Sequence, residues 1–304
     1  MTSSLVGSEM CIRDRYTEKK QVQKLIRDII IHADERSYTT VGKKTLVAEF
    51  DRNFAEDIGI AVCGEFDEDD TYSFDYYLPY LRSDLVSTAE DISIERHAAK
   101  ESYAGICDDP KVGVSLIFYL QNMISYLKLQ GEGKIPAKGT SLNLSALSCQ
   151  GTIMMPIQKT EWQKKKIAKD AVQRNRLIQA ARGGDEEAME SLTLEDMDTY
   201  TSISRKIQKA DIFSLVDTYF MPYGVECDQY SVIGEIEEVE KIRNIYTKEE
   251  IYRMKIESHD LEFVVCINSK DLLGEPQPGR RFKGQIWMQG TLKLEDIIRK
   301  QGIK

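Results

Sequence analysis

Hydrophobic and polar residues alternate in short runs through the first third of the chain, which is the period of half-buried strands. Three runs rich in Val, Ile, Phe and Tyr predict strands at 44–54, 58–66 and 71–81. In the third run, Phe74, Tyr76 and Leu78 share one face. The acidic stretch 67–70 predicts a tight turn between the second and third runs, and hence an antiparallel hairpin. A further strand is expected at 91–97.

Apolar residues three or four positions apart predict helices elsewhere. The expected helices are 17–33, 109–131, 160–182, 185–192 and 193–208. Asp109 is suited to cap the second of these helices, and Pro110 suits its first position. Gly131 and Gly133 are expected to end that helix, and Gly183 with Gly184 to end the third.

The last third of the chain again has the pattern of strands. We expect strands at 230–244, 251–257, 261–268, 281–288 and 291–294, and two more within 139–157, divided near 149–151. Gly234 lies inside a long first strand, where it predicts a bulge or bend. Five short strands with a long, bent first member are typical of an OB-type barrel, with a generic small β-barrel as the alternative.

These elements predict an α+β fold, made of an antiparallel sheet with helices, a helical connector and a small OB-like β-barrel. The expected divisions are an α+β domain at 16–158, the connector at 159–215 and the barrel at 216–304. A length of 304 residues is consistent with two domains or one large one. No apolar run reaches the roughly 18 residues of a membrane span, so no membrane association is expected.

Charge is distributed unevenly along the chain, whose net charge is −9. Residues 51–110 contain 16 Asp and Glu against 4 Lys and Arg, and 111–215 contain 15 basic residues against 11 acidic ones. The acidic region repels phosphate, which argues against nucleic acid as a partner. Apart from Cys11, five cysteines remain without a C-x-x-C pair, which indicates free thiols in a reducing cytoplasm.

The densest group of chemically capable side chains lies at 95–109. Glu95, His97 and Asp108 could serve as general acid or base in a hydrolase, and Arg96 and Lys100 could bind a ligand. Solvated loop residues are the simpler interpretation, because the spacing specifies no geometry. The barrel offers Arg253, Arg281 and Trp287 as further ligand-binding candidates. The carboxylates at 67–70 lack the spacing of a calcium loop, and neither a metal site nor a cofactor is predicted.

Two resemblances add to this picture. The sequence LVGSEMCIRDR at 5–15 resembles a translated sequencing adaptor, so we expect 1–15 to be an artefact that replaces the true N-terminus. The segments 92–122, 184–207 and 216–236 resemble a family of anaerobic Firmicutes known as a domain of unknown function. That resemblance implies a cytoplasmic bacterial protein, and it implies no activity or catalytic residue.

Three functions are compatible with these features. The leading hypothesis is a non-catalytic cytoplasmic binding or adaptor protein whose partner is a protein or a small ligand. One alternative is a hydrolase that uses Glu95, His97 and Asp108, which requires these side chains to converge. The other is an RNA-binding protein that uses the basic helix 160–182 and the barrel. The oligomeric state is left open.

Overall fold

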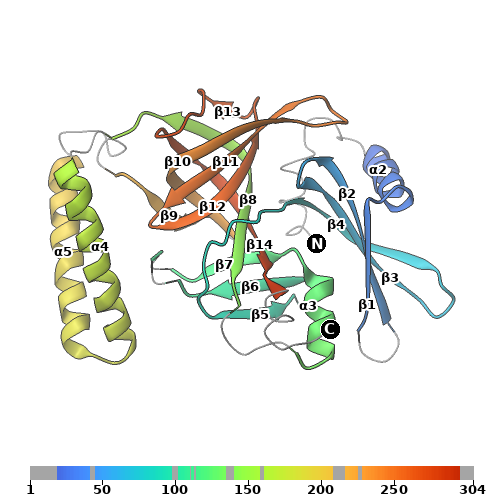
Figure 1. The fold of residues 1–304 in the computed structure, drawn as a ribbon, viewed down its shortest axis with the longest axis horizontal. Helices are drawn as coiled ribbons and strands as arrows, with labels where there is room; N and C mark the ends of the chain where they lie inside the picture. Colours follow the sequence, from blue (N-terminus) through green and yellow to red (C-terminus); the bar gives the residue numbers. More distant parts are fainter. Residues whose placement is uncertain are drawn as a thin grey trace.

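The computed structural model describes residues 19–41, 45–97, 102–109, 111–112, 114–134, 140–157, 161–207, 216–224 and 228–294. The predicted α+β class is confirmed, because the chain forms an antiparallel sheet, a closed five-stranded β-barrel and a small number of helices. Figure 1 shows the sheet on one side of the barrel and a pair of long helices on the other.

The first sheet contains four antiparallel strands in sequential order. They are β1 (Glu35–Val41), β2 (Thr45–Ala55), β3 (Ile58–Phe66) and β4 (Tyr72–Leu81). The hairpin expected around the acidic turn is confirmed, because β3 and β4 pair antiparallel across it. Helix α2 (Lys19–Ile31) covers one face of this sheet, where Leu25 and Ile29 pack against Phe50 and Val62.

The barrel is closed by five strands. They are β8 (Leu142–Met154), β10 (Gln229–Arg243), β11 (Glu250–Ser258), β12 (Leu261–Asn268) and β14 (Arg281–Leu292). β10, β11 and β12 form an antiparallel meander, β8 runs parallel to β12, and β14 closes the barrel between β8 and β10. One of the five barrel strands therefore comes from the segment 16–158, which we expected to form the first domain.

Shorter strands extend the barrel sheet at its edges. β7 (Leu116–Leu120) pairs parallel with β14, and β6 (Tyr103–Cys107) and β5 (Ile92–Arg96) continue antiparallel from β7. β9 (Tyr219–Pro222) pairs with β10, and β13 (Leu272–Leu273) pairs with β8.

The expectation of one helix at 109–131 is wrong. The structure contains strand β7 followed by helix α3 (Met123–Gly131) in its place. Leu116, Phe118 and Leu120 are fully buried while the residues between them are partly exposed, which is the twofold period of a strand. The Asp109 carboxylate accepts a bond from the Lys111 amide and stabilises a turn there.

Three pairs of expected elements are single elements in the structure. The region 139–157 forms the one strand β8, and an irregularity in its pairing with β14 lies between Gln285 and Ile286, opposite the expected break. The region 281–294 forms β14, and 185–208 forms helix α5 (Glu186–Ile207). We expected a bulge or bend at Gly234. The bulge in β10 lies instead between Ile236 and Glu238.

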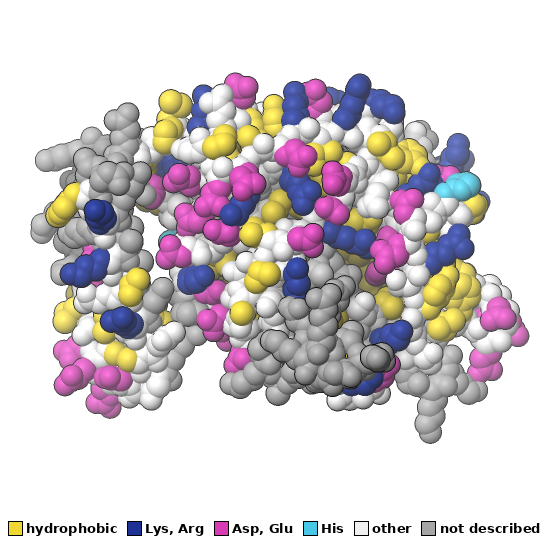
Figure 2. Space-filling model, in the orientation of Figure 1, with side chains coloured by type: hydrophobic (Ala, Val, Ile, Leu, Met, Phe, Trp, Pro, Cys, Tyr) yellow, Lys and Arg dark blue, Asp and Glu magenta, His cyan; other side chains and the backbone are white. Residues whose placement is uncertain are grey.

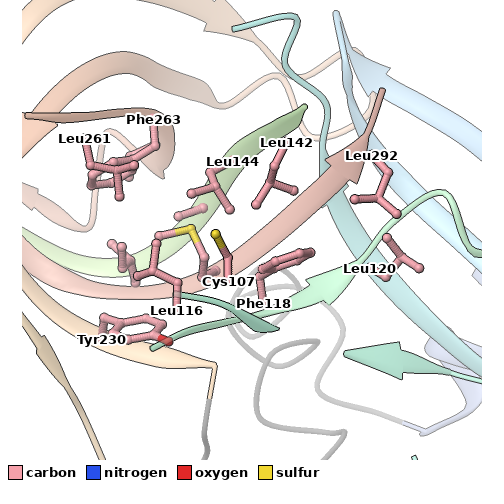
Figure 3. Close-up of a cluster of buried hydrophobic side chains, with 14 of the residues drawn as sticks. Cys107, Leu116, Phe118, Leu120, Leu142, Leu144, Tyr230, Leu261, Phe263 and Leu292 are labelled. Carbon is pink, nitrogen blue, oxygen red and sulfur yellow. The ribbon is translucent and has the colours of Figure 1, made fainter. Parts of the chain in front are cut away.

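The interior of the barrel is filled by side chains. Tyr230, Phe263 and Phe282 are almost completely buried in it, together with leucines from β8 and β12. Figure 3 shows the side chains of Leu142, Leu144 and Phe263 among this cluster. The barrel is therefore a packed core, and ligands must approach it from outside.

The remaining helices form a hairpin that projects from the barrel. Helix α4 (Glu161–Arg182) and helix α5 pack against each other, and neither has another substantial packing partner among the described elements. Figure 1 shows the hairpin beside the barrel, with the turn between its helices at the end away from the connection between β8 and α4. The expected helix at 160–182 is thus confirmed.

Candidate functional site

Two carboxylates are buried between the first sheet and the rest of the molecule. Glu49 and Asp51 are 7% and 4% exposed, and they lie two residues apart on the face of β2 turned away from α2. Helix α3 packs against β1 and β2 beside them. The Asp51 carboxylate is bound by the guanidinium group of Arg82, whose other nitrogen lies 3.0 Å from Glu35 Oε2.

Burial raises the pKa of both carboxylates. Desolvation, reinforced by repulsion from Asp51, raises the pKa of Glu49 to about 8. Desolvation also raises the pKa of Asp51, to about 6, although the Arg82 cation opposes that shift. Both carboxyl groups therefore hold their protons more strongly than exposed carboxyl groups do.

A row of polar side chains leads from Glu49 through the layer between sheet and barrel. The Cys63 thiol donates to Glu49 Oε2 over 3.6 Å, and the Tyr76 hydroxyl, which also interacts with Cys63 and Tyr119, donates to Met123 Sδ over 3.8 Å. Desolvation and the neighbouring carboxylate raise the pKa of the Cys63 thiol well above its usual value. The protonated thiol is a poor nucleophile, so this row does not favour nucleophilic chemistry.

This cluster escaped the sequence analysis, although a signal for it exists. Glu49 and Asp51 interrupt the apolar pattern of β2 at two alternate positions, which places both on one face of the strand. No pattern in the sequence identified Tyr119 as part of this cluster, because its segment was interpreted as a helix.

The structure does not bring Asp108 close to Glu95 and His97. Glu95 and His97 are exposed at one end of the β5–β6 hairpin, where His97 Nδ1 lies 2.9 Å from Ser102 Oγ. Asp108 follows the opposite end of β6 and accepts a bond from Ser115. Six residues of extended chain from Ser102 to Asp108 span about 20 Å. This arrangement does not favour the hydrolase alternative.

The other ligand-binding candidates include two residues close to the β5–β6 hairpin in sequence and one residue of the barrel. Arg96 is exposed on β5, and Lys100 lies outside the described residues. His97 and Trp287 lie on either side of Tyr119, with ring centroids 6.4 Å and 5.7 Å from it. Trp287 is buried and donates its indole N–H to Asp228 over 2.6 Å, so it packs between sheet and barrel.

The two barrel arginines have structural contacts. Arg253 Nη1 lies 3.4 Å from Asp57 Oδ2 and so joins β11 to the turn between β2 and β3. Arg281 is buried and donates to the Met155 carbonyl over 3.0 Å and to the Val216 carbonyl over 2.8 Å. These carbonyls precede and follow the helical hairpin, so Arg281 holds the two ends of the hairpin side by side.

The surface of the hairpin carries large apolar and basic side chains. On α4 a stripe of residues spaced by three and four is exposed: Trp162, Lys165, Lys169, Val172 and Arg176. We call these five residues the α4 stripe. On α5, Met189, Leu194 and Met197 are 45–62% exposed.

Further features limit the chemistry of the described residues. No group of three or more His, Cys, Asp or Glu residues among them could hold a metal ion. No helix in the described part of the chain is long and apolar enough to cross a membrane. Cations on the barrel are neutralised locally, as when Lys255 binds Glu237 and Glu262 at 2.7 and 2.8 Å.

Comparison with known proteins gives a family. The sequence profile of a domain of unknown function, described as "E. rectale Gene description (DUF3881)", matches residues 13–290. No curated protein and no solved structure matches the chain. The match includes 92–122, 184–207 and 216–236, so the resemblance noted in these segments is confirmed, and it includes only the last three residues of 5–15. The chain therefore belongs to the DUF3881 family of domains of unknown function.

Proposed function

We propose that this protein is a non-catalytic binding protein and that the α4–α5 hairpin is the element that docks a protein partner. The observation that carries the proposal is that two helices of 22 residues each project from the barrel and pack only on each other to any substantial extent, among the described elements. Ala188 is the only buried side chain among those described on the two helices. Apolar side chains that are exposed on such a hairpin gain stability when a docked partner covers them.

The geometry of the remaining molecule supports this proposal. The barrel interior is packed, the perturbed carboxylates lie beneath α3 and Arg82, and the residues of the hydrolase alternative lie at opposite ends of a hairpin. The α4–α5 hairpin, in contrast, exposes Trp162 at 70% and Met197 at 62%. Large exposed side chains of this kind are typical anchors of protein interfaces.

The cytoplasm is the compartment that we propose for this binding function. Cys63, Cys107, Cys149 and Cys266 are free thiols. Free thiols are usual for proteins of a reducing compartment.

Photo-crosslinking in the native host tests the proposal. A photoreactive amino acid is placed at Trp162, and a matched control is placed at Leu273, which is 71% exposed on β13. We expect a discrete crosslinked protein species from Trp162 and none from Leu273. The same yield from both positions, or none from Trp162, would contradict the proposal.

A further inference from the structure

The half of the first sheet that lies next to the β3–β4 turn carries aromatic side chains on the side where α2 packs. Strand pairing puts five aromatic residues of β1, β3 and β4 on this side, and we call them the aromatic face: Tyr38, Phe66, Tyr72, Phe74 and Tyr77. Tyr38 and Phe74 are each 43% exposed, and the other three are partly exposed.

The rings of the aromatic face lie in neighbouring rows across the sheet. Tyr38 of β1 and Phe74 of β4 are at the two ends of one row, with two small residues between them. Phe66 and Tyr72 are direct partners in the next row, and their ring centroids are 5.3 Å apart. The Phe66 ring also lies 6.3 Å from that of Tyr38, and Phe74 stacks on Tyr77 at 6.5 Å. The rings therefore form a surface that spans the sheet.

Helix α2 packs on the other half of this side. Its Asp28 carboxylate binds Arg52 at 2.8 Å, and its Ile31 carbonyl accepts a bond from Arg36. Both arginines lie further from the β3–β4 turn along their strands than the aromatic face does. Among the described elements, α2 is the one with substantial contacts on this side, and these contacts are with β2 and β3.

The edge of the aromatic face is acidic. The segment 64–77, which contains the β3–β4 turn, has six Asp and Glu and no Lys or Arg. Asp69 and Asp70 of this turn are exposed. Two lysines, Lys43 and Lys44, belong to the β1–β2 connection and lie outside the described residues. Figure 2 shows Asp and Glu side chains at the end of the β3–β4 hairpin, next to hydrophobic side chains gathered between that end and α2.

The structure already contains a contact between a cation and this group of rings. The guanidinium carbon of Arg36 lies over the Phe50 ring, 6.0 Å from its centroid. Phe50 is buried and meets Tyr38 and Tyr72 edge-on, so it continues the aromatic face beneath α2. Aromatic faces attract cations through their negative charge. With Arg36 and the two lysines included, acidic residues around the rings still outnumber basic ones by six to three.

We propose that the aromatic face binds a basic peptide segment of a partner protein, in which Lys or Arg recurs at short intervals. The cationic groups of the segment contact the faces of Tyr38 and Phe74, and Asp69 and Asp70 bind their charges. The apolar stems of Lys and Arg cover the rings at the same time. This site does not involve the α4–α5 hairpin, so it goes beyond the proposed function and is tested separately.

Charge distinguishes this ligand from the other partners that exposed rings accept. The bases of RNA also stack on aromatic side chains. The phosphates of RNA, however, would be repelled by Asp69 and Asp70. A neutral ligand would gain nothing from these carboxylates. A positively charged peptide uses both the rings and the acidic turn.

Fluorescence anisotropy of the purified full chain with a labelled synthetic peptide tests the proposal. The probe has about twelve residues in which Arg alternates with Ser, and a control probe has Gln in place of every Arg. We expect saturable binding of the Arg probe that weakens with added salt, and no binding of the Gln probe. An Arg probe that does not bind saturably, or a Gln probe that binds equally well, would overturn the proposal.

Two substitutions at Phe74 separate the effect of the ring from that of apolar area. Phe74→Leu keeps an apolar side chain without a ring, so we expect it to bind the Arg probe about twofold to fivefold more weakly. Phe74→Trp supplies the ring that binds cations best, so it should bind at least as tightly as the wild-type chain. Circular dichroism checks that both variants are folded. Equal affinity of the wild-type chain and Phe74→Leu would show that the ring is not part of the site.

A third variant tests the acidic turn. The combined change Asp69→Asn and Asp70→Asn should weaken binding of the Arg probe at low salt and make it less sensitive to salt. The matched controls are Asp84→Asn and Val86→Ala, which lie at exposed positions of the connection between β4 and β5. If the controls weaken binding as much, the probe recognises the overall negative charge of the chain, and the proposal is wrong. Binding of an RNA oligonucleotide in place of the Arg probe would also overturn it.

Discussion

Glu49 makes the stability of this protein depend on pH. An acid whose pKa is raised on folding, here to about 8, keeps its proton in the folded state after the unfolded chain has lost its own. The folded state therefore loses stability as the pH rises from the ordinary carboxyl range towards about 8. Asp51, raised to about 6, adds to this loss at its lower end.

The substitution Glu49→Gln removes this penalty while retaining the shape of the side chain. We expect the variant to be more stable than the wild-type chain at pH 8, by about 2–4 kcal/mol, and similar to it near pH 5. Urea unfolding across this pH range measures the difference. Glu240→Gln, at an exposed position of β10, is the control and should follow the wild-type curve. Parallel curves for Glu49→Gln and the wild-type chain would contradict the assignment.

At the scale of the elements, strand β7 depends on two glycines. The Phe118 ring lies between Gly105 of β6 and Gly290 of β14, and a Cβ atom at either glycine would come within 2.0–2.4 Å of that ring. The absence of two side chains thus makes room for a large aromatic ring where β7 joins the barrel sheet.

The substitution Gly105→Ala should therefore destabilise the chain by about 1–3 kcal/mol, because the buried ring must move or the strands must separate. Thermal unfolding followed by circular dichroism measures this cost. Gly131→Ala is the matched control, since nothing lies within 4 Å of its Cβ position at the end of α3. Equal unfolding temperatures for the two variants would show that the Phe118 ring can accommodate the extra methyl group.

At the scale of the whole molecule, the hairpin is separable from the body. Its two ends are held side by side by Arg281, and none of the side chains described on its helices belongs to the three main clusters of buried apolar residues. The barrel and the first sheet, in contrast, share one cluster that includes Leu81, Leu147 and Trp287. The sheet and barrel therefore form the stable unit.

Replacement of 158–215 by a short Gly-Ser linker should leave this unit folded. We expect the midpoint of thermal unfolding to change by only a few degrees, while the complex with the proposed protein partner is lost. Calorimetry and native mass spectrometry measure the two effects on the same sample. A large fall in the unfolding temperature would show that the hairpin stabilises the barrel directly.

Local patterns predicted those elements that depend on near neighbours in sequence. Alternation in 71–81 and helical spacing in 160–182 predicted two elements that are present in the structure as β4 and α4. The acidic turn at 67–70 likewise indicated the β3–β4 hairpin. The expectation that Phe74 shares a face with Tyr76 and Leu78 is wrong, because a register shift in the pairing of β4 with β3 turns Phe74 to the opposite face, where it stacks on Tyr77. At 109–131, however, Leu116 and Leu120 suit a helix face and a strand face equally well.

Pairing with distant strands decided what local pattern left ambiguous. β7 is a strand because it pairs with β14, about 170 positions later in the chain, and buries Phe118 against it. The barrel includes β8 from 142–154 because that strand pairs with both β12 and β14 and so closes the barrel between them. Such contacts depend on which edges meet after collapse, and no short window of sequence contains that information.

The chemical features of the molecule also divide into those that the sequence determines and those that only the tertiary structure decides. The sequence alone determined the α+β class, the basic character of the helix at 160–182 and the family resemblance. Only the tertiary structure showed that Glu49 and Asp51 are buried, that Asp108 is remote from His97, and that Arg281 binds backbone carbonyls. The physical reason is that burial and hydrogen-bond partners depend on how distant elements pack together, whereas charge and periodicity are properties of the chain itself.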